Sequence, residues 1–534
     1  MKQSFLIFSL FNICLNAHLA TAQIAPDILW QKCYGGSSSD QGLTVDQTLD
    51  GGFIVSGATS SYDGDVSGNH GSDDFWVIRL NGIGDTLWTK SLGGSNYDAD
   101  ANSIHQTSDG GYFLAGTSLS NDGDVSGNHG IHDYWVVKLD STGLVEWQRS
   151  LGGSNADIAF SSQQTEDGGY IVAGGASSTD GDVTGNHGNF DAWLVKLNPL
   201  GVVQWQKCLG GSQNDEAASI QQTSDHGFIV AGYSASNDGD VSNNHGGADY
   251  WIVKLDSAGI IQWQKSLGGT NSDQAFSIYQ IKDGGYICAG GSWSDDGDVS
   301  SNHGGQDYWI VKLDASGNLD WQQSFGGSDY DIASTVFQTN DDGYIVSGSA
   351  SSNDGDVIGN QGGFDCWILK LDTTGAIEWQ KSLGGSGDDG GYAISNFILP
   401  LNDGGYIIVS NSNSNNGDVS GNHGGVDYWI VRLEGIATGL TASPQVSADD
   451  LHVFPNPATD EFKLMLRLKG LEKSRAQINI SNLMGEAINE RSGVVSNGFL
   501  EERIFIDKTQ PSGMYLLKVT VGSRMWNQIL IIER

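Results

Sequence analysis

A twelve-residue acidic loop at 122–133 offers oxygen atoms at regular spacing. It reads DGDVSGNHGIHD, with carboxylate or hydroxyl oxygens at loop positions 1, 3, 5 and 12 and glycine at position 6. Position 7 can add its backbone carbonyl. A hard cation such as Ca²⁺ takes six to eight oxygen ligands, which a short loop supplies from alternate residues. The loop therefore predicts a calcium site.

The loop occurs seven times, and aspartate stands at positions 1, 3 and 12 in the first six copies. The fourth and fifth copies lack glycine at position 6, the sixth has Ile358 at position 5 and the seventh has asparagine at position 1. We expect these four loops to bind calcium more weakly than the first three. The candidate metal ligands are Asp63, Asp65, Ser67, Asp74, Asp122, Asp124, Ser126, Asp133, Asp180, Asp182, Thr184, Asp191, Asp238, Asp240, Ser242, Asp249, Asp296, Asp298, Ser300, Asp307, Asp354, Asp356, Asp365, Asn416, Asp418, Ser420 and Asp427.

The loop resembles the calcium loops of EF-hands and dockerins and, more distantly, those of integrin-type propellers. It departs from the EF-hand pattern in having aspartate at position 12 and in running straight into a strand. The resemblance implies Ca²⁺ as the cofactor, with up to one ion per repeat. The alternative is an unliganded turn, because Asp, Asn, Ser and Gly all favour turns. A turn alone does not require the carboxylate at position 12, which favours calcium.

Two further repeated residues lie near the loop in sequence. The segment Gly-Gly-Ser/Thr-x-x-Asp precedes each repeat and ends in an aspartate that could approach the metal loops or cap its own backbone. A histidine occupies loop position 8 in six copies, where Gln361 replaces it in the sixth. Position 8 is not a side-chain ligand position in the calcium pattern, so we expect a surface or turn-packing role for the histidine. The seven aspartates are Asp40, Asp98, Asp157, Asp215, Asp273, Asp331 and Asp389.

The loops belong to a repeat of 58 or 59 residues, marked by tryptophans from Trp30 to Trp379. Each repeat contains four short apolar runs, and Asp-Gly-Gly between the first two is a hairpin signal. A period of this size with several short strands is typical of propeller blades. The mature chain begins with a fourth strand at 28–33 and the seventh repeat ends after a third strand at 428–434. We therefore predict an all-β fold, a seven-bladed β-propeller at 23–436 that the N-terminal strand closes.

The two ends of the chain differ from the repeats. Residues 1–22 read as a signal peptide, with a lysine, an apolar run and Ala-Thr-Ala before Gln23. A small-residue linker at 437–450 leads to alternating strands at 451–534, which suggest a small β-sandwich. With Pro455-Asn456-Pro457, Met484-Gly485 and Gly513-Met514-Tyr515, residues 451–534 resemble the type A C-terminal sorting domain of the type IX secretion system. The resemblance implies handling by that machinery and release or attachment at the outer surface of a Gram-negative bacterium.

Charge limits the partners of the predicted propeller. Residues 23–444 hold 14 Lys and Arg against 53 Asp and Glu, a net charge of −39. Such a domain repels nucleic acid and anionic membranes. No segment of the mature chain is long and apolar enough for a membrane span. The four cysteines outside the signal peptide are expected to be unpaired thiols.

Three functions remain open. The first is a secreted or cell-surface calcium-binding module that takes part in adhesion through an extracellular glycan or protein. The second is a carbohydrate-active enzyme that uses aspartates on the acidic face, and the third is a purely structural surface module. The repeats are nearly uniform, whereas a catalytic site needs unlike groups close together. Uniformity therefore favours a non-enzymatic role.

Overall fold

A computed structural model describes residues 25–391, 396–435, 451–454, 461–467, 473–482, 487–496, 499–506, 510–511, 513–521 and 524–532. The predicted signal peptide and linker, together with Pro455-Asn456-Pro457 and Met484-Gly485, lie outside these residues. The chain divides into two compact units, 1–436 and 437–534. No described helix is long and apolar enough to cross a membrane.

In the first unit, the described residues form seven four-stranded antiparallel sheets, which we number 1 to 7 in chain order. The first strands are β2 (Asp40–Gln47), β6 (Asp98–Gln106), β10 (Asp157–Gln164), β14 (Asp215–Gln222), β18 (Asp273–Gln280), β22 (Asp331–Gln338) and β26 (Phe397–Pro400). The second strands are β3 (Phe53–Thr59), β7 (Tyr112–Ser118), β11 (Tyr170–Ala176), β15 (Phe228–Ser234), β19 (Tyr286–Ser292), β23 (Tyr344–Ala350) and β27 (Tyr406–Ser412).

The remaining two strands complete each sheet. The third strands are β4 (Asp74–Leu80), β8 (Asp133–Leu139), β12 (Asp191–Leu197), β16 (Asp249–Leu255), β20 (Asp307–Leu313), β24 (Asp365–Leu371) and β28 (Asp427–Leu433). The fourth strands are β5 (Thr86–Leu92), β9 (Val145–Leu151), β13 (Val203–Leu209), β17 (Ile261–Leu267), β21 (Leu319–Phe325), β25 (Ile377–Leu383) and, for sheet 7, β1 (Ile28–Tyr34). The all-β, propeller-type prediction is thus confirmed, with four strands in each repeat.

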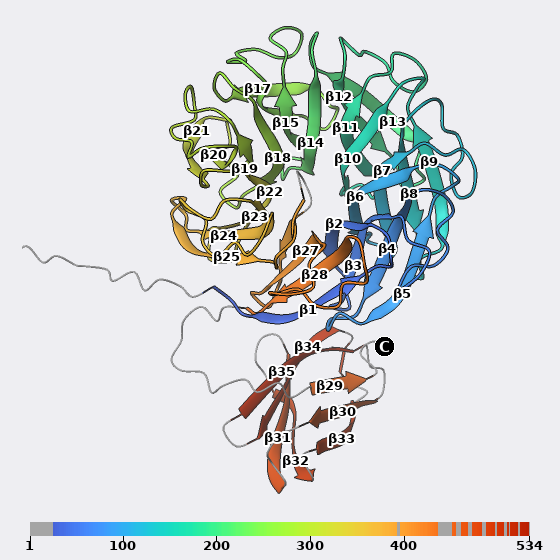
Figure 1. Ribbon diagram of the computed structural model, residues 1–534. Coiled ribbons are helices and arrows are strands. Elements are labelled where there is room, and N and C mark those ends of the chain that lie inside the picture. Colours follow the sequence, from blue (N-terminus) through green and yellow to red (C-terminus); the bar gives the residue numbers. More distant parts are fainter. Residues whose placement is uncertain are drawn as a thin grey trace, which may run out of the picture. The chain divides into compact units, whose positions relative to one another are not determined.

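The sheets follow one another around a ring, with first strands toward its centre and fourth strands at its rim (Figure 1). β1 pairs antiparallel with β28, so the N-terminal strand completes sheet 7. Sheet 7 in turn contacts sheet 1, where the Tyr428 hydroxyl donates to the carbonyl of Trp76. The amide of Asp40 donates to the carbonyl of Val426. The two ends of the repeat region therefore meet.

The core lies between neighbouring sheets. Third strands such as β8 are buried along their whole length because a sheet covers each of their faces. Their tryptophans pack on the preceding sheet, and the ring centres of Tyr134 in sheet 2 and Trp193 in sheet 3 lie 4.6 Å apart. Gly51, with a φ of 82°, supplies the positive φ that the Asp-Gly-Gly hairpin requires. Cys33, Cys208, Cys288 and Cys366 are buried and unpaired, as expected.

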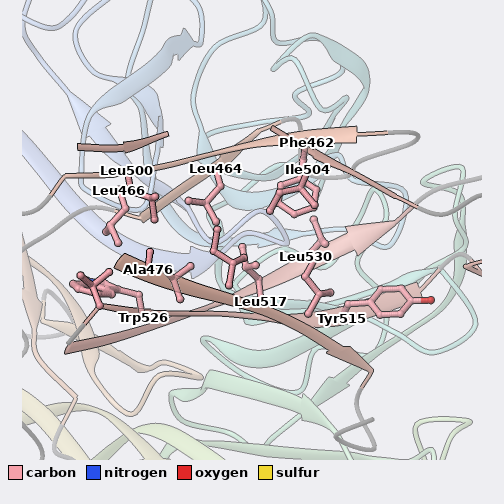
Figure 2. Packing of buried hydrophobic residues seen from close by; sticks show 14 of the residues in the cluster. Phe462, Leu464, Leu466, Ala476, Leu500, Ile504, Tyr515, Leu517, Trp526 and Leu530 are labelled. Carbon is pink, nitrogen blue, oxygen red and sulfur yellow. The ribbon is translucent and has the colours of Figure 1, made fainter. Parts of the chain in front are cut away.

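The second unit contains β29 (Leu451–Phe454), β30 (Glu461–Arg467), β31 (Lys473–Asn482), β32 (Ala487–Ser496), β33 (Phe499–Phe505), β34 (Gly513–Val521) and β35 (Arg524–Ile532). Two layers of strands face each other across an apolar cluster (Figure 2). Phe462 and Ile504 approach it from one layer, and Leu517 and Leu530 from the other. The layers nevertheless share one hydrogen-bonded strand order, β29-β30-β33-β32-β31-β34-β35, because β32 and β33 still pair through Ser496 and Phe499.

Candidate functional site

Loop positions 1 and 3 bind the backbone of the Gly-Gly-Ser/Thr turn that leads into the same sheet. In sheet 1, Oδ1 of Asp63 accepts the Ser37 amide at 2.7 Å and Oδ2 of Asp65 accepts the Gly35 amide at 3.3 Å. All seven sheets repeat both contacts. The first contact is an ordinary hydrogen bond and the second is long. Position 3 is therefore held only weakly.

Loop position 5 points to the outer strand of its own sheet. The amide nitrogen Nε2 of Gln148 donates to the Ser126 hydroxyl at 2.5 Å, and Oε1 of Gln148 accepts the indole N–H of Trp135 at 3.0 Å. The equivalent hydroxyls of Thr184, Ser242, Ser300 and Ser420 accept in the same way. In sheet 6, Gln380 instead binds the backbone of Asp356 and Ile358. The position 5 hydroxyl therefore holds the glutamine that accepts the N–H of a buried tryptophan.

Loop position 12, which we call the third-strand aspartate, opens each third strand and is buried. In sheet 1, Oδ2 of Asp74 accepts the backbone amide of His70 at 2.9 Å and lies 2.7 Å from Nδ1 of the same histidine. The other five histidine-containing loops have the same pair. The histidine therefore has a loop-stabilising role, as the sequence predicts. Gln361 provides only its backbone amide to Asp365.

The second oxygen of the third-strand aspartate faces the next sheet. Oδ1 of Asp74 is buried and has no hydrogen-bond partner among the described residues, and the same holds for the other six third-strand aspartates. A Cβ added to Gly93 would lie 2.5 Å from Oδ1 of Asp74 and 3.0 Å from Oδ2 of Asp98. Two carboxylates from neighbouring sheets thus meet over a glycine. We call this junction of two consecutive sheets a seam.

The aspartate that ends Gly-Gly-Ser/Thr-x-x-Asp, which we call the turn aspartate, is also buried. Oδ2 of Asp98 accepts the amide of Gly94 and the hydroxyl of Ser120, both at 2.6 Å, and Oδ1 accepts the hydroxyl of Ser118. The sequence left two roles open for the turn aspartate, and the structure shows both. It caps its own turn and it approaches the loop of the preceding sheet at the seam.

Burial raises the pKa of the third-strand aspartates. Removal from water is the largest cause for Asp74, and the hydrogen bonds from His70 oppose it. Asp365 lacks a histidine, and burial together with the charges of Asp389 and Asp418 raises the pKa of its carboxyl to about 7. Turn aspartates such as Asp157 also have a raised pKa because of burial. The environment of the seams therefore disfavours the charged form of these carboxyl groups.

The histidine also reaches across the seam to position 3 of the next loop. Nε2 of His423 lies 3.9 Å from Oδ2 of Asp65, and Nε2 of His245 lies 4.0 Å from Oδ2 of Asp298. In the seam that lacks histidine, Nε2 of Gln361 donates to Oδ2 of Asp418 at 2.9 Å. Each seam thus brings together a third-strand aspartate with the turn aspartate and the position 3 aspartate of the next sheet.

The predicted calcium ligands are therefore divided between several partners. Positions 1, 3, 5 and 12 of one loop do not point to a common centre, whereas residues of two consecutive sheets do approach each other at the seam. Within the described residues, no three His, Cys, Asp or Glu side chains are placed to hold a metal ion as they stand. Sequence reasoning missed the seam glycine and the glutamine of the fourth strand, although both recur in most repeats.

The central cavity is a second candidate site. It has a volume of about 250 Å³ and is lined by the first strands of all seven sheets, for example by Ser161 of β10 and Thr335 of β22. Hydroxyl, amide and aromatic side chains dominate its wall, and its described lining contains no Asp, Glu, Lys or Arg. Ser219 and Ser277 each accept a backbone amide of the next first strand, at 3.3 and 3.2 Å. These hydroxyls tie neighbouring sheets together around the cavity.

Strand β34 begins with Gly513-Met514-Tyr515, and the apolar strand β35 follows it. Residues 452–533 match the family model described as the secretion system C-terminal sorting domain. These residues are a type IX sorting domain. The sorting domain directs export to the cell surface or secretion in Bacteroidetes, a Gram-negative group, and implies handling by the type IX machinery.

Similarity of the chain to individual known proteins is distant. The chain is 25% identical over 267 residues to the regulatory protein FlaEY of Caulobacter vibrioides, a match that spans 45% of this chain and 28% of that protein. A mutant of the Synechocystis apocarotenoid oxygenase is 14% identical with a TM-score of 0.36, covering 73% of this chain and 89% of that one. A glycoside hydrolase of family 32 from Bifidobacterium adolescentis is 9% identical with a TM-score of 0.24, covering 94% and 95%. Nothing about activity follows from likenesses this weak.

Proposed function

We propose that the exported chain is a calcium-stabilised, seven-bladed propeller that acts as a binding module at the cell surface or in the medium. The pairing of β1 with β28 supports a closed ring. Contacts between sheet 7 and sheet 1, such as Tyr428 with Trp76, support the same conclusion. Closure removes the unpaired sheet edges that an open array would expose.

The observation that carries the calcium proposal is the buried, unpartnered Oδ1 of each third-strand aspartate. A buried carboxylate oxygen without a partner is costly, and a second carboxylate close by increases that cost. The third-strand, turn and position 3 aspartates offer carboxylate oxygens, the ligands that calcium prefers. At the first seam, Asp74, Asp98 and Asp124 are the residues that would hold the ion.

Ion binding requires one side chain to move. The position 3 side chain is 42% exposed in Asp65, and its carboxylate accepts a long hydrogen bond from the Gly35 amide at 3.3 Å and lies 3.9 Å from Nε2 of His423. It can therefore turn toward the third-strand aspartate at low cost. Bound calcium would supply the positive charge that links consecutive sheets. It would stabilise the ring without taking part in a reaction.

The central cavity supports binding rather than catalysis. Hydrolysis of a glycosidic bond normally uses two carboxylates on opposite sides of the bond. The described lining of the cavity has none. The third-strand and turn aspartates are fully buried at the seams, as in Asp74 and Asp98, where a polysaccharide cannot reach them. A binding module therefore fits these residues better than a carbohydrate-active enzyme.

The test has two parts on the full mature chain. Calorimetry with and without EDTA, combined with metal analysis, checks calcium: an unchanged melting temperature and metal-free protein would contradict it. Arrays of extracellular glycans and proteins check binding. Absence of any ligand, from a folded and calcium-loaded protein, would leave the purely structural module as the better explanation.

A further inference from the structure

First-strand positions that line the cavity vary between sheets, for example Leu43, Asn102, Phe160, Ala218, Phe276 and Ser334 in sheets 1 to 6. A second variable position lies three residues farther along the strand. It holds Asp46, His105, Gln163, Gln221, Tyr279, Phe337 and Leu399 in sheets 1 to 7. Five of these residues, from His105 to Phe337, line the central cavity. A residue with only a packing role would be expected to repeat, as the residues of the third strands do. The variation therefore marks this ring of side chains as adapted to something without sevenfold symmetry.

Sheets 2 to 4 place polar groups on one arc of the cavity. Oε1 of Gln163 accepts the amide of Gln222 at 2.6 Å, and Oε1 of Gln221 accepts the amide of Gln280 at 2.7 Å. Because each carbonyl oxygen is used in this way, each Nε2 remains as a donor for a ligand. Nε2 of His105 lies 3.2 Å from the Ser103 hydroxyl, which adds a further polar group.

Sheets 5 to 7 place aromatic rings on the other arc. The rings of Tyr279 and Phe337 are 5.4 Å apart, and those of Phe337 and Phe397 are 5.9 Å apart, both in edge-to-face arrangement. All three side chains are half-buried and line the cavity. Aromatic faces carry negative charge density and attract the weakly positive C–H groups of a ligand. This arc therefore suits a ligand surface made of C–H groups.

Charge narrows the chemistry of the ligand. The described lining offers no Lys or Arg for a phosphate or carboxylate and no Asp or Glu for an ammonium group. A volume of about 250 Å³ is below the ~300–1,000 Å³ of typical pockets for drug-sized ligands. The occupant is thus small and neutral, with hydroxyl groups on one side and C–H groups on the other. A pyranose ring has this combination.

We propose that the central cavity binds one neutral sugar ring. Nε2 of Gln163 and Gln221 donates to its hydroxyl groups, and its C–H face packs on Tyr279, Phe337 and Phe397. This inference rests on the binding role proposed above and assigns it a site and a ligand class. The seven seams hold the sheets that form the cavity, but the sugar makes no contact with them.

The test uses saturation-transfer NMR on the full mature chain with glucose, galactose, mannose and N-acetylglucosamine, and with glucuronic and sialic acids as charged comparisons. We expect a neutral sugar to bind. Gln163→Glu and Gln221→Glu keep the oxygen that accepts the neighbouring amide and replace only the donor. Each should weaken binding roughly tenfold. Phe337→Leu removes a ring face and should weaken binding to a similar extent.

Two matched controls lie outside the cavity lining. Gln41→Glu makes the same change on an exposed side chain of β2, and Phe325→Leu removes a ring from a buried cluster. Both should leave sugar affinity unchanged. No binding of any neutral sugar by folded protein, binding of acidic sugars alone, or an affinity that the three cavity variants do not alter would overturn the inference. Binding of a protein ligand without sugar binding would overturn it too, while the proposed binding function would stand.

Discussion

The carboxylates of Asp74 and Asp98 belong to neighbouring sheets and meet over the α-carbon of Gly93. A methyl group at Gly93 would lie 2.5 Å from one carboxylate oxygen, so the seam must open to accept it. We expect Gly93→Ala to lower the free energy of unfolding by about 1–3 kcal/mol, the usual cost of overpacking. Urea titration measures the change. Gly82→Ala, in an exposed turn with 3.1 Å clearance to its nearest neighbour, is the control and should cost less.

Calcium bound at the seams should depend on single third-strand aspartates. Asp133→Asn removes one charged ligand at the seam between sheets 2 and 3, so the number of calcium ions per chain should fall by one. In calcium, the melting temperature of Asp133→Asn should be lower than that of the unaltered protein. It should remain above the melting temperature measured in EDTA, because the other seams still bind calcium. Asp140→Asn changes a half-buried aspartate that caps its own turn. Calcium content measured by metal analysis should be equal in Asp140→Asn and the unaltered protein, and a loss in both variants would contradict the assignment.

The seam between sheets 6 and 7 should make stability depend on pH in calcium-free protein. The Asp365 carboxyl has a pKa of about 7 when folded, against 3.8 as its ordinary value. Between these pH values the folded state binds more protons than the unfolded state, so the free energy of unfolding falls as pH rises. Asp365→Asn lacks this titration. The free energy of unfolding of Asp365→Asn, minus that of the unaltered protein, should therefore increase between pH 4 and pH 8.

Gln361→His tests the cause of that pH dependence, because it restores the histidine found in the other six loops. It should supply a hydrogen bond to Asp365 and lower the pKa of that carboxyl. The unfolding free energy, measured in EDTA by urea titration at several pH values, should then fall less with rising pH. An equal slope in Gln361→His and the unaltered protein would show that the missing histidine is not responsible.

The tryptophans of the third strands should depend on the fourth-strand glutamine. Gln148→Leu leaves the buried indole N–H of Trp135 without its acceptor, which should cost about 1–3 kcal/mol. Sheet 1 offers the reverse experiment, since Thr89 occupies the glutamine position and the indole N–H of Trp76 has no partner among the described residues. Thr89→Gln should stabilise the protein by about 1 kcal/mol. Thermal unfolding of both variants measures the two effects.

The fold could be predicted from the sequence largely because it repeats. The 58 or 59-residue period, the Asp-Gly-Gly turns and the displaced fourth strand at 28–33 together indicate strand number, strand order and the pairing of β1 with β28. The turns are local features of the sequence, and the strand order follows from the number of repeats and the place where the first one starts. The strands of the sorting domain were predicted from alternating apolar and polar residues, whereas the single pair joining β32 and β33 has no such signal.

The candidate site could be predicted only in part. The residue types of the loop are those of a calcium site, but spacing along one chain segment says nothing about contacts between sheets. Asp74 turns one oxygen to His70 in its own loop and the other toward Asp98 in the next sheet. The ring from His105 to Phe337 could not be predicted either, because the repeat pattern does not show which variable positions face the central cavity.

The closed ring can be tested by moving β1 within the chain. Deleting residues 25–34 leaves β28 as an unpaired edge and removes Trp30 from the cluster it forms with sheets 1 and 7. We expect a lower melting temperature and less cooperative unfolding.

The control is a permuted full chain that starts at Gly35 and places residues 27–34 after Glu434. The sequence Ser-Thr-Gly, taken from the turn at 141–143, joins the two segments. In that turn the amide of Asp140 donates to the carbonyl of Leu144. The amide of Glu434 donates to the carbonyl of Asp27 in the same way, so the same turn fits between them. The permuted chain should recover most of the lost melting temperature by calorimetry, and if deletion alone leaves the transition unchanged, β1 does not close the ring.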